Sequence, residues 1–161
     1  MRAGGEAMLR GAGAGLMVCA GLWLGREMAR FWSARRRSLE ACGALFQYLL
    51  DAVQYQRLPA EDILARLKGE GDFAMFLPAG CAALRQLVPP GGLTTRQAAH
   101  FSSCIRAFGR QGLEGQCEQL RREIAYFARC AEGVREREKA AAAICPRVGL
   151  CVGMMLALAL F

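Results

Sequence analysis

The residues whose side chains could do chemistry are few and scattered along the chain. There is one histidine, His100, and there are eight cysteines, none of which forms a Cys-x-x-Cys pair. Zinc sites usually appear in a sequence as closely spaced cysteine and histidine ligands, so we expect no metal site and no cofactor. A chain of 161 residues can bury a core without disulfides, and we interpret most of the cysteines as small core or membrane residues.

Two other groups of residues resemble catalytic equipment but have simpler explanations. Glu61 and Asp62 follow Pro59, where they would favour the positive end of a helix dipole. The glycine-rich residues 11–15 lie in an apolar stretch, which is typical of close helix packing rather than phosphate binding. The sequence also lacks a Walker loop, a Gly-x-Ser-x-Gly turn and a dinucleotide-binding turn. We therefore predict a non-enzymatic protein, in which His100 is a partly buried or exposed helix residue.

Apolar residues recur at intervals of three and four, which predicts helices as the elements that position all of these groups. Residues 39–53 carry one apolar stripe, and Pro59 opens a short helix through residue 67. Residues 73–88 are expected to form a third helical stretch, bent at Pro78, which stops at the turn residues 89–92. The stripe of the first helix is formed by Leu39, Cys42, Phe46, Leu49 and Val53, and that of the second by Ile63, Leu64 and Leu67.

Two further helices are predicted in the second half of the chain. Thr94 or Thr95 can cap a helix that buries Phe101 and Ile105, together with Ala98 and Phe108. The last helix carries a coiled-coil-like seam, and its charged residues, Glu123 among them, are assigned to the opposite faces. We favour the seam as the core of a bundle over a surface for another helical subunit, such as a second copy. The seam residues are Cys117, Leu120, Ile124, Phe127, Ala131 and Val134.

These patterns together predict an all-α fold, because no segment shows sustained alternation with a period of two. We expect an antiparallel helical bundle of about five or six helices, flanked by N- and C-terminal transmembrane helices.

The membrane prediction depends on the two ends of the chain. Residues 11–25 and 148–161 carry no charged side chain, whereas the chain as a whole has a formal net charge of +7. Charged side chains are costly in hydrocarbon, so we predict anchors at 1–25 and 148–161 and a bundle at 26–147. The uncharged stretches themselves, residues 11–25 and 148–161, are shorter than the roughly 20 residues that span a bilayer, which would require local thinning. The alternatives are a cleaved signal peptide at the N-terminus and a buried helix at the C-terminus.

Basic residues lie next to both apolar ends and indicate which side the bundle occupies. Arginines 26, 30 and 35–37 follow the first end, and residues 135, 137, 139 and 147 precede the second. They would meet anionic lipid headgroups on the cytoplasmic side. The basic residues are not interleaved with aromatics, so we do not expect nucleic-acid binding.

Two stretches, residues 45–59 and 108–116, together with the charged helix and apolar segment that follow, resemble the stage III sporulation protein AB family. The resemblance implies a small protein of the mother-cell membrane facing the forespore, within the channel-like apparatus that joins the two cells. Its soluble part is similar to the cytoplasmic helical domain of the platform protein of type II secretion and type IV pilus machines. The implied partners are a cytoplasmic ATPase, stage III protein AA, and other stage III membrane subunits.

The resemblance also assigns residues to the two turns. Tyr55, Leu58 and Pro59 match the family's earlier turn, and Gly109 and Gln116 match its last interhelical turn. Gly112 departs from the acidic residue that the family commonly has, and glycine can also serve as a helix cap. We expect ATPase docking to involve Gly109 and Gln116 and the neighbouring Arg121 and Arg122.

Two alternative functions remain at this stage. One is a platform-like subunit of a secretion or pilus system, although such proteins normally have two related helical domains. The other is an exported or lipid-anchored basic helical protein that binds anionic polymers.

Overall fold

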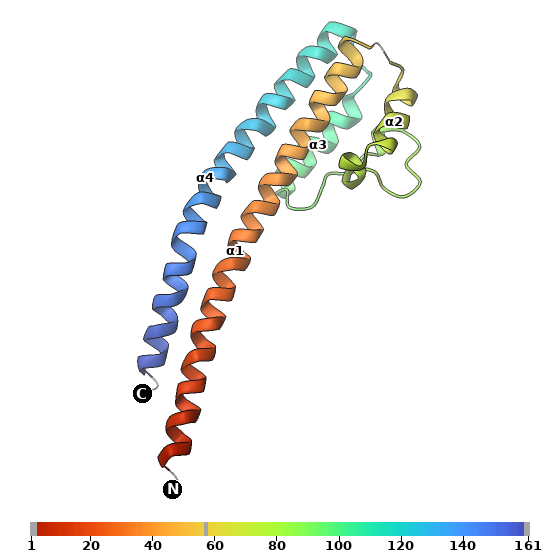
Figure 1. The fold of residues 1–161 in the computed structure, drawn as a ribbon. Coiled ribbons are helices and arrows are strands. Elements are labelled where there is room, and N and C mark those ends of the chain that lie inside the picture. Colours follow the sequence, from red (N-terminus) through yellow and green to blue (C-terminus); the bar gives the residue numbers. More distant parts are fainter. Residues whose placement is uncertain (1–2, 57, 160–161) are drawn as a thin grey trace. The chain divides into compact units, whose positions relative to one another are not determined.

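The structure is a computed structural model that describes residues 3–56 and 58–159, with side-chain surroundings given mainly from residue 19 to residue 144. The described residues are helical and contain no strand, which confirms the predicted all-α class (Figure 1). The α-helices are α1 (Ala3–Gln54), α2 (Ala60–Gly69), α3 (Thr95–Ala107) and α4 (Leu113–Ala159). Two short 3-10 helices, η1 (Gly71–Phe76) and η2 (Leu84–Gln86), lie between α2 and α3.

The chain divides into two compact units, and both long helices contribute to each of them. The central unit is Ala34–Gly133, and the terminal unit combines Met1–Ser33 with Val134–Phe161. The predicted boundaries of the membrane anchors and the bundle, at residues 25/26 and 147/148, stay predictions.

In the central unit, α1 and α4 pack side by side in antiparallel directions, as predicted. Phe46 stacks on Phe127 with ring centroids 5.5 Å apart, and further along α1 the Gln54 side chain accepts a hydrogen bond from Arg121 at 3.1 Å. Residue numbers therefore rise along α1 as they fall along α4. The predicted stripe of α1, from Leu39 to Val53, is buried throughout. This burial confirms the helical interpretation of residues 39–53.

Four fully buried phenylalanines hold the elements of the central unit together. They come from α1, η1, α3 and α4, and they are Phe46, Phe76, Phe101 and Phe127. Phe101 has its ring centroid 5.6 Å from that of Phe46 and 5.7 Å from that of Phe76. Large aromatic side chains bury more apolar area than any others, so this cluster is the centre of the core.

The segment between α2 and α3 differs from the prediction. Residues 73–88 do not form a third α-helical stretch, because only the short helices η1 and η2 form, joined by a loop. Pro78 has no N–H to continue a helix, and Gly80 adopts φ +77°, which ends regular structure. The Val88 N–H donates to the Phe76 carbonyl at 3.0 Å and closes the loop. Several of its apolar residues are still buried, among them Phe73, Leu84 and Leu87, whereas Met75 and Val88 are exposed.

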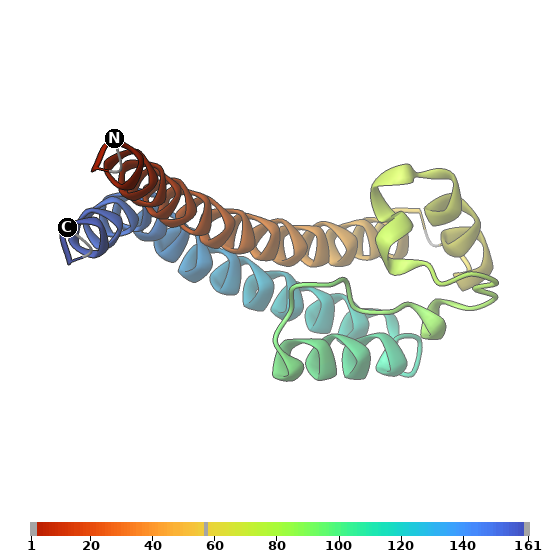
Figure 2. The ribbon, with the colours of Figure 1, turned by 90° about the horizontal axis from the view of Figure 1, so that it is seen from below.

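The start of α3 is fixed by a cap and by a contact with α1. Thr94 forms a capping box with Gln97, which confirms one of the two predicted caps. The Ser38 hydroxyl on α1 donates to the Gly91 carbonyl at 2.5 Å. The adjacent Gly92 adopts φ +88°, and a Cβ placed there would lie 3.3 Å from the Ser38 hydroxyl. Within the central unit, α3 lies along α4 (Figure 2), as the contacts between their aromatic rings show.

The terminal unit contains the described parts of both predicted anchors, whereas residues 1–2 and 160–161 of those anchors lie outside the described residues. Its best-defined contact places the Arg137 guanidinium 5.8 Å from the ring centroid of Trp32. Neither helix breaks where its predicted anchor meets the bundle. Large apolar side chains are exposed on both helices, including Trp23, Leu24 and Met155. Within the described residues, none of the helices offers a stretch of the length and apolar character that crossing a bilayer demands.

Candidate functional site

The two turns that the resemblance singled out, after α1 and after α3, meet at one end of the central unit. The first follows α1, where the Leu58 N–H donates to the Ala52 carbonyl at 3.3 Å and Pro59 caps α2. The second follows α3, where Gly109 reverses the chain with φ +78° before α4 begins. Positive φ is easily reached only by glycine, which explains this residue type in the turn.

The residues of these turns line a shared hollow, which we call the turn hollow. It brings Leu58 from the first turn together with Gly109 and Gln116 from the second. The rest of its lining is mostly apolar and consists of Val53, Ala60, Ile63, Phe108 and Leu113. The structure thus places three of the sequence-predicted site residues, from positions far apart in the chain, in one surface feature.

The other predicted site residues lie outside this lining. Tyr55 is 75% exposed, and Pro59 is exposed at the start of α2. Arg121 lines a neighbouring hollow with Gln54 and Leu113, so Leu113 is common to both hollows. Arg122 lines neither hollow and instead pairs with Glu118 at 3.1 Å on the surface of α4.

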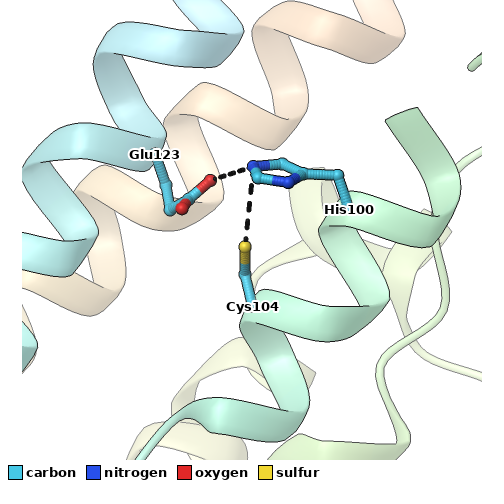
Figure 3. Close-up of side chains that lie close together, drawn as sticks. All are labelled: His100, Cys104 and Glu123. Carbon is cyan, nitrogen blue, oxygen red and sulfur yellow. Dashed lines mark hydrogen bonds and ion pairs between the residues drawn. The ribbon is translucent and has the colours of Figure 1, made fainter. Parts of the chain in front are cut away.

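A second candidate site, which the sequence analysis missed, joins α3 to α4 (Figure 3). His100 and Cys104 are four residues apart and therefore share one face of α3. Glu123 reaches them from α4, with its Oε2 2.7 Å from His100 Nε2. The Cys104 sulfur lies 3.8 Å from the same nitrogen. The imidazole N–H can therefore donate to the carboxylate while the thiol lies beside both groups.

The burial of Glu123 corrects the predicted seam. Glu123 was assigned to an exposed face and Ile124 to the seam, but Glu123 is only 9% exposed and Ile124 is partly exposed. Burying a charged carboxylate is costly unless it is paired, and His100 supplies the partner. The remaining seam residues are buried, including Cys117, Leu120 and Phe127.

The surroundings of the cluster keep its thiol protonated and its imidazole in place. Burial, followed by the nearby charge of Glu123, raises the pKa of Cys104 to about 12. A thiol with such a pKa is not an activated nucleophile at neutral pH, so the cluster does not resemble a cysteine–histidine catalytic pair. The Tyr126 ring packs against the imidazole with centroids 4.5 Å apart.

The sequence contained part of the signal for this cluster. The spacing of His100 and Cys104 puts two ligand-type side chains on one helix face, but the third member is 19 residues beyond Cys104, on another helix. The ligand atoms of the three residues all lie within 4.8 Å of one another. That closeness depends on how α3 packs on α4, which spacing along the chain does not specify.

Comparison with known proteins gives one match. Residues 10–79 match the family described as stage III sporulation protein AB, which confirms the resemblance found in the sequence. The matched range includes the first turn, with Tyr55, Leu58 and Pro59, and ends before the second turn. Neither the curated proteins nor the solved structures include a significant match.

Proposed function

We propose, on the premise of the match of residues 10–79 to the stage III sporulation protein AB family, that this chain is a non-enzymatic scaffold of the channel-like apparatus between mother cell and forespore. The match supports a role in sporulation. In the proposed role, the central unit docks the cytoplasmic ATPase of the apparatus, and the terminal unit holds the complex at the mother-cell membrane. The chain would act by contact and would not catalyse a reaction.

The observation that carries the docking proposal is the meeting of the two family turns in the turn hollow. Leu58 is about 50 residues before Gly109 and Gln116 in the sequence, yet all three line one surface feature. A hollow with a mostly apolar lining and polar groups beside it has the composition of a protein–protein contact. The exposed apolar side chain of Leu113 continues this surface into the neighbouring hollow.

Arg121 provides a positive charge in the neighbouring hollow of this docking surface, which Glu114 and Glu118 also line. Its guanidinium donates to the Gln54 side chain at 3.1 Å, so the positive charge is held beside Leu113. Arginine is enriched at protein interfaces and pairs well with acidic partners. We therefore place Arg121 at the centre of the ATPase contact, whereas Arg122, which is paired with Glu118, contributes less.

The exposed apolar side chains of the terminal unit support the membrane part of the proposal. Trp23 is 64% exposed, and Leu24, Phe31, Ile144 and Met155 are also exposed. A group of exposed apolar side chains usually marks a surface that meets lipid or another protein. Basic residues 26, 30 and 135 lie nearby in sequence and suit anionic headgroups.

The docking proposal can be tested with the detergent-solubilised full-length chain and the purified ATPase in a biolayer interferometry assay. We expect Arg121→Glu and Leu113→Asp each to weaken binding about tenfold, because one reverses the charge and the other interrupts the apolar surface. Both residues are exposed, and Asp is well tolerated in the first turn of a helix, so the fold should be retained.

Two matched variants serve as controls. Arg129→Glu makes the same charge reversal further along α4, and Met75→Asp makes the same change at an exposed apolar residue of η1. Neither should change the affinity by more than about twofold. If the parent chain does not bind the ATPase at low salt, or if all four variants bind equally well, the proposed docking surface is wrong.

A further inference from the structure

We propose that His100, Cys104 and Glu123 form a binding site for a divalent transition-metal ion of the zinc type. This inference is independent of ATPase docking, because the cluster and the turn hollow share no residue. The metal would join α3 to α4 inside the central unit and would therefore have a structural role.

The chemistry of the three donors suits zinc. Imidazole nitrogen, thiolate sulfur and carboxylate oxygen are the three kinds of ligand that zinc takes from proteins. The Cys104 thiol, which is protonated in the metal-free chain, would release its proton to solvent as it binds the ion. Calcium and magnesium fit less well, since these harder divalent ions prefer oxygen ligands alone. The mixed donor set thus selects a borderline transition metal rather than an alkaline-earth ion.

The spacing of the donors is close to that of a tetrahedral site. Bond lengths of about 2.0–2.3 Å to zinc place two ligands roughly 3.5 Å apart. The Cys104 sulfur and His100 Nε2 are 3.8 Å apart, and the three ligand atoms lie within 4.8 Å of one another. His100 Nε2 and Glu123 Oε2, at 2.7 Å, would separate slightly to admit the ion.

Electrostatics and access also favour a cation. Among the residues that the structure describes, Glu123 is the charged residue with a buried side chain. A divalent ion would compensate the charge of its carboxylate more completely than one imidazole N–H does. The His100 side chain is 40% exposed, which leaves a path from solvent and room for a water molecule as fourth ligand. Zinc sites with three protein ligands and a water molecule in the fourth position are well known, although structural zinc sites usually have four protein ligands.

Cobalt binding to the full-length chain provides the first test. Cobalt(II) replaces zinc in such sites and gives a thiolate-to-metal charge-transfer band, which reports directly on a cysteine ligand. We expect the band in the parent chain and its loss in Cys104→Ser. The matched variant Cys117→Ser, which changes another buried cysteine, should keep the band. Glu123→Gln keeps the shape of the side chain and should weaken cobalt binding at least about tenfold.

The single histidine allows a second, independent measurement. With ¹⁵N-labelled histidine, the chain gives the signals of one imidazole, so a zinc-dependent change of the Nε2 resonance can come only from His100. We also expect saturating zinc to raise the melting temperature of the parent chain by several degrees and to have a much smaller effect on Glu123→Gln.

Three results would overturn the site. They are the absence of a cobalt band at excess metal, a band that survives in Cys104→Ser, and an imidazole Nε2 resonance that zinc does not move. If Cys104→Ser does not fold, the imidazole resonance of the parent chain decides the question alone. In the event of a negative result, the cluster is a structural hydrogen-bonded group, and the docking proposal is unaffected.

Discussion

Phe127 and Phe31 are both phenylalanines, but their surroundings in the structure differ. Phe127 is 0% exposed in the aromatic cluster of the central unit, whereas Phe31 is 54% exposed in the terminal unit. Both lie on the long helices, and both have basic residues close by in the sequence. The central unit covers its apolar side chains with α2, α3 and the 3-10 helices. An apolar residue in the sequence therefore indicates a side chain that is favoured away from water. Whether other parts of the protein bury that side chain depends on tertiary packing.

The strongest test of this comparison is to place the same charge in both units. Phe127→Asp puts an unpaired carboxylate in the aromatic cluster and should lower the free energy of unfolding by at least about 4 kcal/mol. Phe31→Asp makes the same change at an exposed residue and should change it by no more than about 0.5 kcal/mol. Circular dichroism during thermal unfolding measures both. Equal melting temperatures for the two variants would contradict the burial of Phe127.

The burial of Cys42 in the central unit predicts a dependence of stability on pH. Burial raises the pKa of Cys42 to about 12 from its ordinary value of 9.0. Between these values the unfolded chain loses the thiol proton and the folded chain keeps it, so stability is complete below pH 9 and falls as the pH rises. The expected slope from this thiol is about 1.4 kcal/mol per pH unit.

Denaturant unfolding of the parent chain and of Cys42→Ala at pH 8, 10 and 11 measures this effect. Other buried groups also ionise at alkaline pH, so the informative quantity is the difference between the two slopes. The variant should be less stable at pH 8, because it loses packing, and its stability should fall less steeply above pH 9. Parallel curves would show that the thiol is ionised to the same extent in both states.

The smallest predicted effect is in the terminal unit. Arg137→Gln removes the positive charge 5.8 Å from the ring centroid of Trp32 and should cost about 0.5–1 kcal/mol. Arg26→Gln changes an exposed residue of the same type in the terminal unit and is a suitable comparison. If Arg137→Gln is no more destabilising than Arg26→Gln in a thermal melt, the interaction with Trp32 does not stabilise the terminal unit.

The helices could be predicted from the sequence where local signals agreed. The stripe of residues 39–53, the short helix after Pro59 and the cap at Thr94 all follow from spacing and residue type, and all three are present. The secondary structure of residues 73–88 was more difficult to predict, because an apolar segment can be buried without being helical. Pro78 and Gly80 shortened the helical pieces there, and the hydrogen bond from Val88 to Phe76 depends on tertiary packing.

The candidate sites show the same limit. The sequence identified the first family turn from its residues, but the turn hollow also requires the ends of α1 and α3 to lie near the start of α4. The position of Glu123 fits a helical seam through Leu120 and Phe127 as well as Ile124 does, and hydrophobicity favoured the wrong residue. Only the approach of His100 from another helix explains why a carboxylate occupies the buried position.

Gly92 and Gly109 both adopt positive φ, but we expect the two positions to tolerate substitution to different extents. At Gly109 there is open space around a side chain, so asparagine, which tolerates this backbone conformation, could be accepted during evolutionary drift. At Gly92 a side chain would also meet the Ser38 hydroxyl and the Arg35 backbone, which adds a steric barrier to the conformational one. The loop that leads into α3 can therefore change its other residues more freely than this one.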